Sequence, residues 1–150
     1  MYFSKPTFGV NYPKTAAFYD YVNVALTNIG TDLLVFDIPV YNYGNCYSKH
    51  MDILTAPQGG VYVFSLTIFL GRGSYVEVNI YRNSEVVWRV YGDIATSHAF
   101  SSPSMVTVIY MTIGDVTYLR TSSITTSAGS VYNDSNVKSS FAGWKIADLV

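Results

Sequence analysis

The sequence has few charged residues, and neither sign of charge dominates. Charged residues make up 13% of the 150 residues and the net charge at pH 7 is −1, whereas soluble domains average about 25% charged residues. Without a basic run, the main electrostatic attraction to nucleic acid or to an anionic membrane surface is missing. We therefore expect that the protein does not bind nucleic acid and does not insert into a membrane. The low charge has two explanations that stay open here, a buried oligomer interface or an aromatic-rich β core.

Cysteine is nearly absent. Cys46 is alone in the chain, which excludes an internal disulfide and a cysteine-based metal site. A single cysteine is either buried or paired with another chain, and we favour burial because free cysteine often behaves as a small apolar side chain.

Long hydrophobic runs are also missing. The longest apolar stretch, Val61–Leu70, contains Tyr, Ser and Thr and ends at a glycine, and it is much shorter than the roughly 18 residues of a membrane-spanning helix. The N-terminal residues lack the apolar segment of a signal peptide, so a secreted form would be the mature chain.

No catalytic motif is visible. The two histidines, His50 and His98, do not form an H-E-x-x-H zinc motif, and neither a G-x-S-x-G elbow nor a phosphate-binding loop is present. The aspartates are scattered along the chain. We therefore expect a protein that is not an enzyme.

What the sequence has in abundance is strand signals. Short runs of Val, Ile, Thr, Tyr and Phe are bounded by Gly, Pro, Asn and Ser, and in Tyr75–Ile80 apolar and polar residues alternate, as they do in a half-buried strand. No window has a helical period. We expect an all-β sandwich or jelly roll with strands near Tyr21–Thr27, Leu34–Phe36, Tyr41–Asn42, Met51–Thr55, Gly60–Leu70, Tyr75–Arg82, Val86–Tyr91, Met105–Thr112, Asp115–Thr121 and Ser139–Ala147. We expect turns at Pro57–Gly60, Arg82–Glu85 and Ile113–Asp115, where Gly60 and Gly114 serve the backbone.

An aromatic and glycine pattern runs through the first half of the chain. It reads F-x5-N-x4-Y-x6-L-x5-G-x-Y-x-F-x-L over Phe36, Asn42, Tyr47, Leu54, Gly60, Tyr62, Phe64 and Leu66. This pattern resembles the signature of the globular head domain of complement C1q, with leucine replacing an aromatic at two positions. Further segments match in the same order: Thr55–Phe64, Gly114–Leu119 and Ser139–Trp144.

The resemblance implies a ten-stranded jelly roll related to tumour necrosis factor, assembled as a compact homotrimer and secreted. It implies a domain over residues 20–150, preceded by a partly extended N-terminal segment, residues 1–19. The side chains expected to fill the sandwich and the threefold seam are Phe36, Tyr47, Tyr62, Phe64 and Phe141.

A binding site is expected where loops gather. In a jelly roll every second connection lies at the same end, and here that end collects residues 28–33, 71–74, 92–103 and 121–136. Polar groups beside an aromatic ring suit sugar recognition. The candidate ligand-binding residues are Arg72, Tyr75, Asp93, His98, Tyr132 and Asn133. For each residue taken singly, a role in a solvated connector is the competing interpretation.

Calcium is a possible cofactor because related domains often bind it near this end. Asp134 is the candidate ligand, with Asn133 beside it. Calcium takes 6–8 oxygen ligands, and no second acidic residue is adjacent, so Asp93 or a neighbouring subunit would have to complete the site.

Two functions follow from the resemblance. The leading hypothesis is a secreted pattern-recognition or lectin-like protein that binds carbohydrate or microbial surface molecules through the apical loops of a trimer. The alternative is a structural or cytokine-like signalling trimer that binds a protein partner, with its ligand surface on the sides between subunits.

Overall fold

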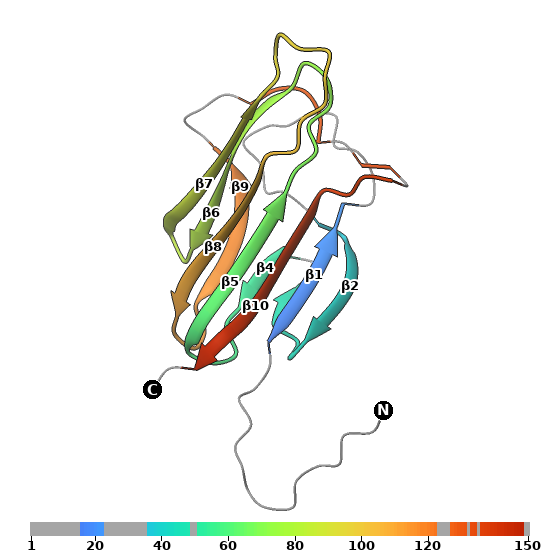
Figure 1. The fold of residues 1–150 in the computed structure, drawn as a ribbon. Coiled ribbons are helices and arrows are strands. Elements are labelled where there is room, and N and C mark those ends of the chain that lie inside the picture. Colours follow the sequence, from blue (N-terminus) through green and yellow to red (C-terminus); the bar gives the residue numbers. More distant parts are fainter. Residues whose placement is uncertain are drawn as a thin grey trace, which may run out of the picture.

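The computed structural model describes residues 16–22, 36–48, 51–122, 127–131, 133, 134 and 136–148. These ranges contain ten strands and no helix (Figure 1). The strands are β1 (Ala17–Tyr21), β2 (Ile38–Tyr43), β3 (Tyr47–Ser48), β4 (Ile53–Thr55), β5 (Gly60–Thr67), β6 (Tyr75–Arg82), β7 (Glu85–Asp93), β8 (Ser104–Met111), β9 (Val116–Thr121) and β10 (Ser140–Asp148).

The strands form two antiparallel sheets of five strands each. The first sheet has the order β2-β1-β10-β5-β8 and the second has the order β3-β4-β9-β6-β7. The chain crosses repeatedly from one sheet to the other, so the last strand, β10, pairs with both β1 and β5. The expected all-β sandwich is confirmed.

The expected strands differ from the observed ones mainly near the N-terminal end. β6 has the expected bounds, but β1 begins at Ala17 rather than near Tyr21, and residues 23–27 lie outside the described residues. β3 was not expected, because two residues form a strand only through their pairing with β4. Phe36 belongs to no strand, and residues 34 and 35 also lie outside the described residues.

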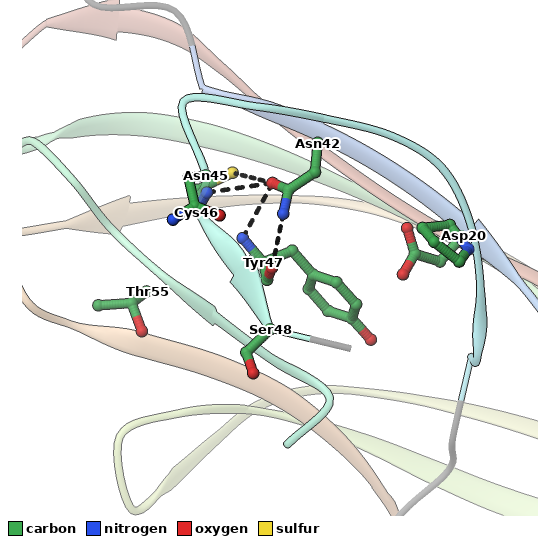
Figure 2. Close-up of a pocket in the computed structure, with 8 residues that line it drawn as sticks. Asp20, Asn42, Asn45, Cys46, Tyr47, Ser48 and Thr55 are labelled. Carbon is green, nitrogen blue, oxygen red and sulfur yellow. Dashed lines mark hydrogen bonds between the residues drawn. The ribbon is translucent and has the colours of Figure 1, made fainter. Parts of the chain in front are cut away.

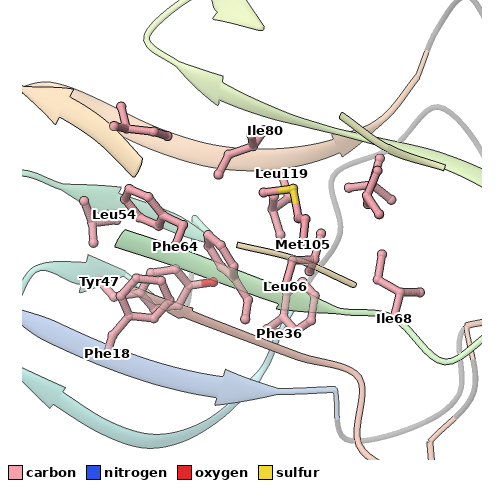
Figure 3. Packing of buried hydrophobic residues seen from close by; sticks show 14 of the residues in the cluster. Phe18, Phe36, Tyr47, Leu54, Phe64, Leu66, Ile68, Ile80, Met105 and Leu119 are labelled. Atoms are coloured by element: carbon pink, nitrogen blue, oxygen red, sulfur yellow. The ribbon is translucent and has the colours of Figure 1, made fainter. Parts of the chain in front are cut away.

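Alternation explains the core between the sheets. In β5 the side chains of Tyr62, Phe64 and Leu66 point inward and are at most 1% exposed, as the period of two in a strand requires. Phe36 and Tyr47 are also buried in this cluster (Figure 3), and so is Phe141. The aromatic signature therefore fills the sandwich of a single chain.

Two glycines are required by close packing. A Cβ on Gly143 would lie 2.5 Å from the ring of Phe18 and 2.8 Å from that of Phe64, and a Cβ on Gly60 would lie 2.3 Å from the backbone oxygen of Ala147. Of the two glycines expected to serve the backbone, only Gly114 has a positive φ, at 85°. Gly60 is needed for space and not for its φ angle.

The single cysteine is buried. Cys46 is 3% exposed and has no disulfide partner, and burial raises the pKa of its thiol. Among the described residues no helix is long and apolar enough to cross a membrane.

Candidate functional site

The strand directions bring three long connections to one end of the sandwich. β5, β7 and β9 end there and β6, β8 and β10 begin there, whereas the start of β1 and the end of β10 lie at the opposite end (Figure 1). We call this the apical end. It holds the described parts of the predicted loops 71–74, 92–103 and 121–136, and residues 28–33 lie outside the described residues.

Backbone hydrogen bonds tie these connections together. The Leu70 N–H donates to Ser101 O at 2.7 Å, and the Gly71 N–H donates to Ser130 O at 3.0 Å. The hydroxyl of Ser74, which is fully buried, accepts from the Ser130 N–H at 2.9 Å. Because these bonds satisfy backbone groups from three different loops, the apical end is held as one unit.

An apical pocket of about 270 Å³ lies among these loops. It is lined by Phe69, Phe100, Asp134 and Val137. The guanidinium of Arg72 lies over the ring of Phe100, with its Cζ 5.1 Å from the ring centroid, a cation–π distance. The pocket thus places two phenylalanines and an aspartate together, and the Arg72 guanidinium lies over one of the two rings.

Asp134 has a defined structural role in this pocket. Its Oδ1 accepts hydrogen bonds from the backbone N–H groups of Asn136 at 2.6 Å and Val137 at 2.8 Å, which is the pattern of an Asx turn. Within the described ranges no three His, Cys, Asp or Glu side chains cluster as metal ligands would.

The other predicted ligand residues are distributed over the apical end. Asp93 accepts from the Ala95 N–H at 3.0 Å and the Tyr91 hydroxyl at 3.1 Å, so its carboxylate closes a turn. Tyr75 is half-buried at the start of β6, where its backbone pairs with Ala128. His98 is exposed in the β7–β8 connection and Asn133 is half-buried beside Asp134, while Tyr132 lies outside the described residues.

The sequence prediction therefore included Arg72 and Asp134 but missed the rings that complete the pocket. Phe69 lies within Gly60–Leu70, which the sequence predicts as one strand, and Phe100 lies within the predicted apical loop 92–103. Phe100 is 52% exposed. A large apolar side chain within an otherwise polar connection was the available signal.

A second pocket, of about 500 Å³, opens at the β2–β3 side of the sandwich (Figure 2). Asn42 organises its wall: its Oδ1 accepts from the N–H groups of Cys46 and Tyr47, each at 3.1 Å, and its Nδ2 donates to Tyr47 O at 2.6 Å. The signature asparagine is thus explained by the turn between β2 and β3.

Replacing Asn42 with alanine should destabilise the protein by about 2–3 kcal/mol, because three hydrogen bonds are lost at about 1 kcal/mol each. Asn42→Asp keeps the acceptor oxygen for both N–H groups and should lose less. Denaturant unfolding followed by tryptophan fluorescence measures both. Equal stability of Asn42→Ala and the wild type would contradict the role given to Asn42.

A buried carboxylate, that of Asp52, contacts Tyr47 on β3. Asp52 is 5% exposed and its Oδ1 accepts from the Phe36 N–H at 3.2 Å and the Tyr47 hydroxyl at 3.3 Å. Burial raises the pKa of the Asp52 carboxyl and, together with the nearby carboxylates, the pKa of Tyr47. The donors to Asp52 come from two signature aromatics, so this network holds the scaffold.

The outward side of the first sheet is an apolar face. Strand register puts Tyr43, Ala17, Trp144, Val63 and Val108 in one row across all five strands, and cross-strand partners share a face. Val106, Val108, Tyr110, Trp144 and Ile146 are between 39% and 66% exposed. So much exposed apolar surface on one face indicates a protein contact.

The edge strand of the second sheet, β7, exposes another large side chain. Trp88 pairs with the buried Ile80, so alternation turns it toward the inside of the sandwich, yet it is 53% exposed. The reason is that β7 is an edge strand, with its inner side only partly covered by β8.

Two five-stranded sheets with this strand order, whose loops build a pocket at one end, define a jelly-roll β-sandwich domain. A family model described as the C1q domain matches residues 17–146. The chain belongs to the C1q domain family, as the aromatic signature indicated.

Solved structures support the same fold. The globular domain of zebrafish complement 1qA protein is 12% identical and has a TM-score of 0.68, with 89% of this chain and 99% of that chain covered. Eiger TNF from S. frugiperda is 14% identical and has a TM-score of 0.65, with 91% of this chain and 94% of that chain covered. Murine APRIL at pH 5.0 is 13% identical and has a TM-score of 0.60, with 89% of this chain and 100% of that chain covered. No curated protein matches the chain.

Proposed function

We propose that this protein is a secreted homotrimer that recognises carbohydrate or microbial surface molecules through its apical loops. The observation that carries the proposal is the apical pocket, in which the rings of Phe69 and Phe100 lie beside the carboxylate of Asp134 and below the guanidinium of Arg72. Ring faces stack on the C–H groups of a sugar, while the charged groups bind its hydroxyls. This is a binding role and not a catalytic one.

The apolar face supports the trimer. A monomer would leave Trp144, Val108 and Tyr110 in water, and burying them against a neighbour recovers about 25 cal/mol for each Å² of apolar surface. We propose that the edge carrying Trp88 packs against the apolar face of the next copy. Such a contact joins two different surfaces, and it closes into a ring when the rotation between copies is threefold.

Trimer formation raises the apparent affinity of the apical pockets for a repeating ligand. A single pocket of about 270 Å³ that binds one or two sugar units would bind weakly. Three pockets at the same end can engage a repeating surface together, and linkage of this kind raises apparent affinity by about 10²–10⁴-fold when the spacing fits. Repetitive microbial polysaccharides are therefore suitable ligands.

The apical pocket is tested by Phe100→Ala and Arg72→Gln on a glycan array that includes lipopolysaccharides, with and without a chelator. Loss of one stacked ring should weaken each site by about 2–12-fold, and the array signal should fall further because three sites act together. Phe100 is 52% exposed, so its removal should leave the unfolding temperature nearly unchanged.

Ile113→Ala is the control, since Ile113 is 74% exposed in the β8–β9 turn, at the end opposite the apical pocket. Binding that survives in Phe100→Ala as it does in Ile113→Ala would remove the pocket from the proposal. Binding lost only with chelator would show that a metal completes the site, with ligands beyond the described residues. Silence across all glycans would reject the proposed ligand class.

A signalling or structural trimer that binds a protein is the second candidate. The observation in its favour is that β7 exposes both Trp88 and Tyr91 on the side of the domain, and exposed aromatics are typical of protein interfaces. This candidate predicts an empty glycan array together with saturable capture of one cell-surface protein, and Tyr91→Ala would reduce that capture.

A further inference from the structure

The apical pocket is lined mainly by apolar residues. Within the described ranges, Phe69, Phe100 and Val137 line it together with one acidic residue, Asp134. Its volume of about 270 Å³ lies just below the range of about 300–1,000 Å³ that is usual for small-molecule pockets. The pocket is therefore large enough for one sugar unit, or for one substituent of a sugar, and not for an extended chain.

Hydrogen bonds hold the two phenylalanine-bearing segments in place. The Phe69 N–H donates to the hydroxyl of Ser139 at 3.0 Å, and Ser139 is fully buried at the start of the last strand. The next residue, Leu70, donates its N–H to the carbonyl oxygen of Ser101 at 2.7 Å, and Ser101 directly follows Phe100. The walls of the pocket are thus positioned before a ligand binds, which lowers the cost of binding.

Asp134 places a hydrogen-bond acceptor next to an apolar wall. Its Oδ1 accepts from the Val137 N–H at 2.8 Å, so the carboxylate and the side chain of Val137 are held close together. A carboxylate has two oxygens with about four acceptor positions. Asp134 can therefore close this turn and also accept from an N–H group of a ligand.

This lining distinguishes between the groups that a sugar can carry. A hydroxyl group that points into the pocket meets mostly phenyl and isopropyl groups, and a polar group buried without a hydrogen bond costs free energy. A methyl group in the same place gains free energy by leaving water. A cationic amino group is opposed by Arg72, whose guanidinium already lies over the ring of Phe100 at 5.1 Å, because like charges repel each other.

We propose that the apical pocket binds the acetamido group of an N-acetylated sugar. The acetyl methyl packs against Phe69, Phe100 and Val137, and the amide N–H donates to the carboxylate of Asp134. This inference rests on the carbohydrate-binding function proposed above and names the class of sugar that the pocket selects.

The test compares three trisaccharides that differ only at C2 of each unit. Chitotriose carries acetamido groups, its fully deacetylated form carries ammonium groups, and cellotriose carries hydroxyl groups. In calorimetric titrations of the full chain, chitotriose should bind at least about tenfold more tightly than cellotriose, since one additional methyl in an apolar pocket usually has that effect. N-acetylgalactosamine, galactosamine and galactose give the same comparison for the other common configuration at C4.

NMR locates the group that enters the pocket. When the aromatic protons of the protein are saturated, the acetyl methyl protons of the ligand should receive more magnetisation than its ring protons, because the methyl lies against Phe69 and Phe100. Stronger transfer to the sugar ring protons than to the methyl would contradict this orientation.

Two variants test the lining. Val137→Ala should weaken chitotriose binding by about fourfold for each methyl group that loses contact with the ligand. Val116→Ala is the matched control and should bind as the wild type does, because Val116 is also half-buried but lies at the start of β9, at the opposite end.

Asp134→Asn keeps an oxygen that can close the Asx turn but removes the charge. It should weaken chitotriose binding by about tenfold or more, the usual loss for a hydrogen bond to a charged group. Wild-type affinity in this variant would contradict the role given to Asp134. All variants are first checked for an unaltered unfolding temperature.

The outcomes separate this inference from the function on which it rests. Equal binding of acetylated and hydroxylated sugars would overturn the inference and leave carbohydrate binding in place. Tighter binding of the deacetylated trisaccharide would also overturn it, since the pocket would then select a cation. Array signals confined to glycans without acetamido groups would reject the inference alone, whereas an array silent for all glycans would reject both.

Discussion

Replacing Phe141 with alanine is expected to lower the free energy of unfolding by about 3–5 kcal/mol, the usual cost of removing a buried phenyl ring. Phe141 is 1% exposed. Its ring centroid lies 5.0 Å from that of Phe18, 5.9 Å from those of Phe36 and Phe64, and 6.5 Å from that of Tyr47. Its loss therefore leaves a cavity bordered by four other aromatic rings.

This loss is a large part of the free energy of unfolding of a typical domain, which is about 5–15 kcal/mol. The unfolding temperature of Phe141→Ala should therefore be lower by roughly tens of degrees, or the variant should aggregate. Differential scanning calorimetry and denaturant unfolding measure the change. Ile113→Ala is the control, because Ile113 is 74% exposed in the β8–β9 turn and should shift the free energy by less than about 0.5 kcal/mol. A similar small effect for Phe141→Ala would contradict the core described here.

Replacing Trp144 with arginine should dissociate the proposed trimer. Trp144 is 39% exposed in the centre of the apolar face, where it pairs with Ala17 on one side and Val63 on the other. Interface tryptophans often contribute on the order of 2 kcal/mol to binding. Arginine at this position would also bury an unpaired charge, which adds a further penalty. Each subunit contact repeats this loss, so the trimer should fall apart at micromolar concentration.

Light scattering coupled to size-exclusion chromatography measures the mass across a dilution series. The control is Ile113→Arg: Ile113 is 74% exposed in the β8–β9 turn, outside both the apolar face and the β7 edge, and the new charge is tolerated there. The wild type and Ile113→Arg should both have the mass of three chains. A wild-type mass of one chain, or a trimer that survives Trp144→Arg, would contradict the assembly.

Much of the fold could be predicted because local alternation is strong. The bounds of β6 were predicted correctly, since Val76, Val78 and Ile80 alternate with polar residues. β3 could not be predicted, because its two residues depend on pairing with β4. β1 was expected too late in the chain, because Ala17–Tyr21 is defined by its pairing with β10, at the far end of the sequence.

The candidate sites were less predictable than the fold. Arg72 and Asp134 were identified because the order of strands sends their loops to one end. Phe69 and Phe100 were missed because their position beside those residues depends on how the loops pack. The apolar row on the first sheet crosses five strands, and strand register cannot be read from any of them singly.

By itself the sequence determined the family, the all-β class, the aromatic core and the absence of recognisable catalytic motifs, because each depends on residue type and short spacing. Only the tertiary structure decided which apolar residues stay outside the core, such as Trp144 and Val108, and which residues meet at the apical pocket. The physical reason is that strand pairing between distant segments sets the register, and register decides which side chains share a face.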